Sequence, residues 1–77
     1  MEVKQLRDAR NGIAEEIRRR GFKQSAIAKM AGLTEQQLSD IINKRRKMDA
    51  NEMFQLCSVM GASMEAMFYP DTGQTSA

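Results

Sequence analysis

The sequence predicts an all-α fold, a compact arrangement of five short helices, and three features support this class. Apolar residues recur three and four positions apart, which places them on one face of a helix. Capping side chains and glycines divide the chain at short intervals, as expected at helix starts and stops. No stretch alternates apolar and polar residues over more than a few positions, so we predict no β-sheet.

The first two helices are predicted to end at glycines. The first helix begins either near Val3 or near Asp8, because Gly12 weakens its middle. Three arginines precede Gly21, where the helix dipole favours cations and glycine suits the left-handed residue that ends a helix. A second, shorter helix is predicted over residues 23–31, after which the next glycine ends it. The apolar residues expected on their inner faces are Val3, Leu6, Ile13, Ile17, Ile27, Ala28 and Ala31.

Two capping boxes, in which two side chains at a helix start bond reciprocally to the backbone, mark the third and fourth helices. The boxes are formed by Thr34 with Gln37 and by Asp49 with Glu52. The third helix should cover about residues 35–43, and Gly61 should end the fourth. Ser63 is expected to cap a short fifth helix that cannot extend through Pro70. The apolar residues expected on the inner faces of the third and fourth helices are Leu38, Ile41, Ile42, Met53, Leu56, Cys57 and Met60, and the fifth helix contains Met64, Met67 and Phe68.

The composition is that of one small domain, placed at residues 1–70, with a flexible tail at 71–77. With 77 residues, the core must be tightly packed or completed by dimerisation. The chain has no histidine and one cysteine, Cys57, which excludes an internal disulfide, a Cys/His zinc site and histidine-based catalysis. We therefore expect no enzymatic activity, no metal and no cofactor. No apolar run is long enough to span a membrane, and residues 1–4 lack the apolar stretch of a signal peptide. We therefore expect a cytoplasmic location and no membrane partner.

The charges are unevenly distributed along the chain. Between Arg18 and Lys47 lie nine of the twelve basic residues and two of the ten acidic ones, so this segment carries +7 and the remainder −5. A polarised charge map suits a protein that presents one face to a polyanion. Two solvated charge runs without a partner are the alternative.

Residues 24–43 combine two short helices with a tight, glycine-containing turn. Ala28 is small where the two helices must approach closely. Leu33, Leu38 and Ile41 are apolar where the pair must pack on a core. This pattern is typical of a helix-turn-helix, whose second helix enters the major groove of DNA with its N-terminal end.

Residues 11–68 resemble the lambda-repressor/Cro type of helix-turn-helix proteins, also called the XRE family. The matching features are Gln24 at the start of the second helix, the step from Ala28 to Gly32, Leu33-Thr34, and Met60-Gly61-Ala62-Ser63. Together they are fairly specific, and they imply the lambda-repressor-like five-helix domain. One departure is Ile42-Asn43-Lys44, which stands where the family frequently has Glu-x-Gly. This change concerns the loop and leaves the fold intact.

The resemblance implies two groups of DNA contacts. The base-reading positions are Thr34, Glu35, Gln36, Ser39 and Asp40. The phosphate-contacting positions are Gln24, Asn43, Lys44, Arg45, Arg46 and Lys47. Gln36 is the best candidate for a bidentate contact to adenine, whereas Glu35 and Asp40 only accept and suit a cytosine amino group. For Gln36, Ser39 and Glu35, a merely solvated helix surface stays open as the alternative.

The resemblance also implies double-stranded DNA with a pseudo-palindromic operator as the partner, bound by a homodimer. The expected dimer contacts are Phe54, Met64, Met67, Phe68 and Tyr69.

Three functions are compatible with these features. The first is a sequence-specific DNA-binding transcriptional regulator, repressor or Cro-like, of a phage, mobile element or bacterium. The second is an antitoxin or antirepressor that uses the same fold mainly to bind a protein partner, which the acidic Glu35 and Asp40 favour. The third is binding of RNA or an anionic membrane through the basic loop, which predicts little preference between DNA sequences.

Overall fold

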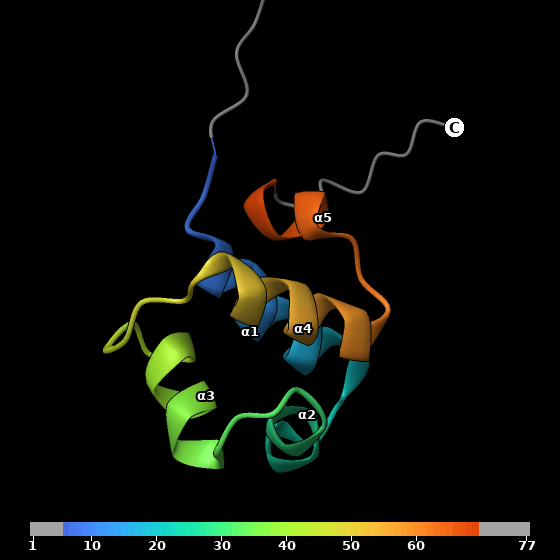
Figure 1. Ribbon diagram of the computed structural model, residues 1–77. Helices are drawn as coiled ribbons and strands as arrows, with labels where there is room; N and C mark the ends of the chain where they lie inside the picture. Colours follow the sequence, from blue (N-terminus) through green and yellow to red (C-terminus); the bar gives the residue numbers. More distant parts are fainter. Residues whose placement is uncertain (1–5, 70–77) are drawn as a thin grey trace, which may run out of the picture.

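A computed structural model describes residues 6–69, and within this range the chain forms five helices and no strand (Figure 1). The helices are α1 (Ala9–Arg20), α2 (Gln24–Met30), α3 (Glu35–Ile42), α4 (Ala50–Met60) and α5 (Met64–Phe68). The all-α, five-helix class predicted from the sequence is therefore confirmed. Pro70 and the predicted tail at 71–77 lie outside the described residues.

Helix α1 begins directly after Asp8, which is one of the two starts that the sequence allows. Asp8 is the N-cap, and its side chain accepts a hydrogen bond from the backbone N–H of Arg10 at 3.0 Å. The later start is thus correct, and Val3 lies outside the described residues. At the other end, Gly21 adopts φ 70° as the left-handed cap that the sequence predicts.

Both predicted capping boxes are present. The backbone N–H of Gln37 donates to Thr34 Oγ1 at 3.0 Å, and Gln37 Oε1 accepts from the N–H of Thr34 at 2.9 Å. Asp49 and Glu52 make the same reciprocal pair at 2.8 and 3.1 Å. These bonds satisfy N–H groups that have no partner within the helix, so they fix where α3 and α4 begin.

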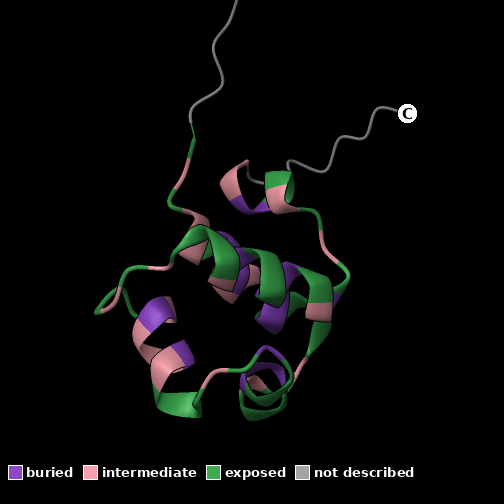
Figure 2. Ribbon diagram, in the orientation of Figure 1, coloured by how far each residue is buried: buried purple, intermediate pink, exposed green. Residues whose placement is uncertain are grey.

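The core lies where the inner faces of the helices meet (Figure 2). Its largest fully buried side chains are Ile13, Leu38, Ile41, Leu56 and Met67. Ala28 of α2 is also fully buried, and α2 packs chiefly against α3 and α4. The core therefore holds α3 by its apolar side, which leaves the opposite side of that helix to solvent.

The packing of α5 on α1 corrects one prediction. Met67 was expected at a dimer contact, but its side chain is 1% exposed and belongs to the core of its own chain. A Cβ added to Gly12 would lie 2.5 Å from the Cα and 2.8 Å from the carbonyl carbon of Met67. The two backbones therefore touch, and Gly12, which weakens α1 as an isolated helix, is what permits this approach.

A buried acid in α1 was not predicted from the sequence. Glu16 is 6% exposed and forms ion pairs with Arg19 at 2.8 Å and Arg20 at 2.5 Å. Burial alone raises the pKa of Glu16, but the hydrogen bond from Arg19 and the charges of both arginines outweigh it and hold the pKa below its ordinary value. Arg20 also donates to the carbonyl oxygen of Met60 at 2.9 Å, which ties the end of α1 to the end of α4.

Candidate nucleic-acid interface

The turn between α2 and α3 has the geometry that the helix-turn-helix pattern predicts. Gly32 adopts φ 80°, a left-handed conformation that a glycine reaches without steric cost. The N–H of Leu33 then donates to the carbonyl oxygen of Ala28 at 2.8 Å, which closes the end of α2. Thr34 follows directly as the N-cap of α3, so the two helices are joined by four residues.

The predicted base-reading residues lie on the outer side of α3. Thr34, Glu35 and Gln36 are exposed, and Ser39 and Asp40 are half-buried. On the opposite side of the same helix, Leu38 and Ile41 are fully buried. The N-terminal end of α3 is therefore a polar surface on a rigid support, which is the arrangement needed to read base edges.

Asp40 connects two of the predicted contact residues. Its Oδ1 accepts a hydrogen bond from Gln36 Nε2 at 2.9 Å and another from Arg45 Nε at 3.1 Å. The negative charge of Asp40 is thus paired with a cation of the loop and is not an isolated acid on the surface.

The connection between α3 and α4 bends sharply at Lys44. This residue has φ 64°, and among residues 6–69 it is the one non-glycine residue with positive φ. It occupies the position where the family frequently has glycine. The bend brings the N–H groups of Arg45 and Arg46 to the carbonyl oxygen of Asp40, at 2.8 and 3.2 Å.

The four predicted loop cations do not share one role. Lys44, Arg45 and Lys47 are exposed and remain available to a polyanion. Arg46 instead turns toward α4, where it pairs with Glu52 at 2.8 Å, and its carbonyl oxygen accepts from Arg10 Nη1 at 3.0 Å. We therefore reassign Arg46 from phosphate contact to holding the loop against the bundle.

The start of α1 supports the same loop. Arg10 bonds to the Asp8 carboxylate through Nε at 3.0 Å and Nη2 at 2.6 Å, while its Nη1 reaches the loop. The side-chain hydrogen bond from Arg10 lowers the pKa of Asp8 to about 2. Sequence reasoning missed this support, because residues 10 and 46 are far apart in the chain and only the folded bundle brings them together.

The remaining predicted phosphate contacts lie at the start of α2 and just after the end of α3. Gln24 is half-buried at the first position of α2. Asn43 is exposed, and its Nδ2 donates to the carbonyl oxygen of Ser39 at 2.9 Å. The side chain of Asn43 therefore closes the last turn of α3.

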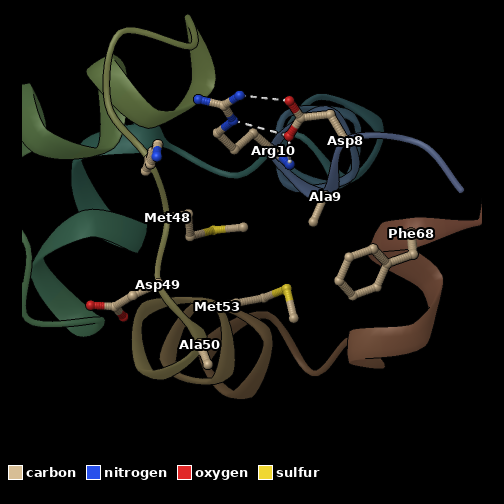
Figure 3. Close-up of a pocket in the computed structure, with 9 residues that line it drawn as sticks. Asp8, Ala9, Arg10, Met48, Asp49, Ala50, Met53 and Phe68 are labelled. Atoms are coloured by element: carbon tan, nitrogen blue, oxygen red, sulfur yellow. Dashed lines mark hydrogen bonds and ion pairs between the residues drawn. The ribbon is translucent and has the colours of Figure 1, made fainter.

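Two of the predicted dimer residues, Phe68 and Phe54, line separate hollows. Phe68 faces a groove of about 420 Å³ between the start of α1, the loop and α4, together with Met48 and Met53 (Figure 3). Phe54, 60% exposed, lines a second hollow with Met30, which is 66% exposed. Phe68 and Phe54 therefore do not belong to one continuous surface.

The other two dimer predictions lie near α5. Met64 and Tyr69 are half-buried at the beginning and just beyond the end of that short helix. Of the five predicted dimer residues, four are thus at least partly exposed, and Met67 is buried.

Two further findings concern the described part of the chain. Between residues 6 and 69, no cluster of three or more Cys, Asp or Glu side chains is arranged to hold a metal ion. None of the five helices in this range is long and apolar enough to cross a membrane.

Comparison with known proteins places this architecture in a class. A family model described as helix-turn-helix matches residues 13–66. One similar solved structure is the P22 c2 repressor in complex with synthetic operator 9T in the presence of Tl+, with a TM-score of 0.70 and 15% identity, covering 84% of this chain and 98% of that one. Another is the DNA-binding domain (1–76) of the P22 c2 repressor in solution, with a TM-score of 0.75 and 17% identity, covering 99% and 96%. No curated protein matches the chain.

The five helices have the fold of a lambda-repressor-like helix-turn-helix domain. Because the family model matches more than half of the chain, the protein belongs to the helix-turn-helix family. The resemblance drawn from the sequence is thereby confirmed.

Proposed function

We propose that this protein is a sequence-specific DNA-binding transcriptional regulator that reads the major groove with the N-terminal end of α3. The observation that carries the proposal is the exposed polar end of α3, at Thr34, Glu35 and Gln36, flanked by the exposed cations Lys44 and Arg45. Polar side chains can bind base edges, and cations beside them can bind the phosphates of the same duplex.

Gln36 is proposed as the main base-reading residue. One of its amide N–H groups bonds to Asp40, and the other N–H and the carbonyl oxygen remain for a base. That donor and acceptor together fit the major-groove edge of adenine. Thr34, Glu35 and Ser39 are proposed to contact neighbouring bases.

Contacts to the phosphates are proposed for residues at the start of α2 and after the end of α3. Gln24 lies at the start of α2, where the helix dipole favours an anion. Asn43, Lys44, Arg45 and Lys47 follow the end of α3 and would track the backbone. Such contacts fix the register of the protein on the duplex and carry little sequence information.

A homodimer on a pseudo-palindromic operator of a phage, mobile element or bacterium, in the cytoplasm, completes the proposal. Phe68 supports it, because the groove that it lines is open and largely apolar in a single chain. Met64, Tyr69 and Phe54 are the further candidate contacts.

The alternative, an antitoxin or antirepressor that holds a protein partner, has one supporting observation. Met30 and Phe54 are exposed apolar residues that line one hollow. The acidic character of α3, which also favoured this alternative, weighs less because Asp40 is paired with Arg45.

The test is selection of bound fragments from a random DNA library, followed by affinity measurements on the selected site. Gln36→Ala should cost about 1–3 kcal/mol on that site and little on random DNA. Gln55→Ala removes the same amide from an exposed position of α4 and serves as the matched control. A library without any enriched sequence, with the protein folded, would contradict the proposal and favour the alternative.

A further inference from the structure

Asp40 touches both halves of the proposed DNA interface. Its carboxylate bonds to Gln36 at 2.9 Å and to Arg45 at 3.1 Å, in both cases through Oδ1. Its carbonyl oxygen accepts from the N–H of Arg45 at 2.8 Å. One residue therefore links the side chain that reads a base to the loop that approaches the phosphates.

We propose that Asp40 is a positioning residue, which sets the base preference of Gln36 and does not itself read a base. This inference rests on the proposed DNA-binding function. It is an alternative to the sequence-based expectation that Asp40 pairs with a cytosine amino group, because Gln36 and Arg45 both donate to its Oδ1 and tie the carboxylate to them.

The chemistry of the two side chains makes the orientation specific. A carboxylate only accepts, so Asp40 binds the NH₂ end of the Gln36 amide and not its oxygen. The amide then presents its second N–H and its oxygen outward in a fixed order. Adenine offers a matching acceptor and donor in the major groove, whereas guanine offers two acceptors. Without Asp40, the amide turns over freely and this discrimination weakens.

The pairing with Arg45 explains how an acid is tolerated beside phosphates. The side chain of Asp40 is 28% exposed, and Arg45 Nε lies 3.1 Å from its Oδ1, so the negative charge of the carboxylate is paired with a guanidinium. Arg45 uses Nε for this bond, and its outer nitrogens remain for a phosphate. The left-handed bend at Lys44 directs the chain back so that this pair forms.

The test compares Asp40→Ala, Gln36→Ala and the double variant on the selected site and its single-base variants. Asp40→Ala should reduce discrimination at the base pair read by Gln36 by about tenfold, while affinity for random DNA rises because a negative charge is removed. The double variant should discriminate no less at that base pair than Gln36→Ala alone. Glu65→Ala is the control, since it removes an exposed carboxylate from α5, outside the proposed DNA interface, and should leave that base pair unaffected.

Two outcomes would overturn the proposal. Loss of discrimination at a different base pair, with the Gln36 base pair unchanged, would mean that Asp40 reads a base directly. Additive losses in the double variant would mean that the two residues act independently.

A second readout needs no DNA and keeps the inference separate from the proposed function. In the free protein, the side-chain amide resonances of Gln36 should shift in Asp40→Ala and stay in place in Glu65→Ala. Unchanged Gln36 resonances in Asp40→Ala would overturn the contact. A wild-type protein without sequence preference would contradict the proposed function instead.

Discussion

Two regions of this small bundle, α5 and the connection between α3 and α4, are fixed by different kinds of contact. α5 packs on α1 through the buried side chain of Met67 and a direct backbone approach at Gly12. The connection places one apolar side chain, the half-buried Met48, against the core, and it is otherwise held by charged pairs, chiefly Arg46 with Glu52 and Arg45 with Asp40.

Because α5 is held mainly by packing and the loop mainly by ion pairs, the two regions should respond differently to solution conditions. Apolar packing is insensitive to salt and to acid, whereas ion pairs near the surface weaken with both. The proposed DNA-contacting loop thus depends on the same charges that a polyanion would engage, and the following variants separate the two kinds of contact.

The largest effect is expected at the α1–α5 contact. Gly12→Ala should destabilise the fold by about 3 kcal/mol, because the added methyl collides with the backbone of Met67 and α5 must move away. Asn11→Ala, at an exposed position of the same turn, should be neutral or slightly stabilising. Urea unfolding of both variants measures this. Equal stability of the two would show that α5 does not press on α1 at this point.

The next effect is expected at the ion pair that holds the loop. Arg46→Ala should destabilise the fold by about 1–3 kcal/mol, because the carboxylate of Glu52, 14% exposed, loses its partner. Arg45→Ala, at the adjacent exposed position, should change stability by less than about 0.5 kcal/mol.

The effects of the two substitutions on DNA binding should follow the opposite order, with the larger effect for Arg45→Ala. Arg45→Ala should reduce the salt slope of DNA binding by about one unit, corresponding to one lost phosphate contact. If the two arginines contributed alike in both measurements, the division of roles within the loop would be wrong.

A smaller effect is expected at the bend of the loop. Lys44→Gly should stabilise the fold by up to about 1 kcal/mol, because the left-handed conformation costs a residue with a Cβ about 1–2 kcal/mol and glycine gives part of this back through its unfolded-state entropy. Lys44→Ala removes the same charge but keeps the strain, so it should not stabilise. Thermal unfolding of the pair separates strain from charge, and a stabilised Ala variant would rule strain out as the cause.

The smallest effect is the acid dependence of the support at α1. The pKa of Asp8 is lowered from its ordinary 3.8 to about 2, so its stabilising contribution is present above about pH 4 and is lost as the pH falls through about 2. Because the side chain is 35% exposed, we expect only a few tenths of a kcal/mol. Asp8→Asn keeps a capping side chain without the charge. The stability difference between wild type and variant should shrink from pH 4 to pH 2, whereas a constant difference would contradict the assignment.

Local features of this molecule were predictable from the sequence, and long-range ones were not. The capping boxes and the glycine that ends α1 involve residues within a few positions of each other, so composition and spacing suffice. The bend at Lys44 had a signal as well, since lysine replaces a frequent glycine of the family there.

The features that were missed depend on tertiary packing. The bond between Arg10 and the carbonyl oxygen of Arg46 joins residues brought together only by the fold. Met67 was misassigned because α5 has five residues, too few for its spacing to show which side faces inward. The sequence also suggested four equivalent loop cations. The structure separates Arg46 from the other three because Arg46 pairs with Glu52 of α4, a contact that only the folded chain creates.

The N-terminal end of α3 and the loop that follows this helix are proposed to form the DNA interface. The most direct test is titration of the protein with its selected DNA site while the backbone amide resonances are followed. The changes should concentrate at Thr34–Gln36 and Lys44–Lys47 and leave α5 nearly unaffected. Changes concentrated at Met30 and Phe54, with α3 unmoved, would contradict the claim.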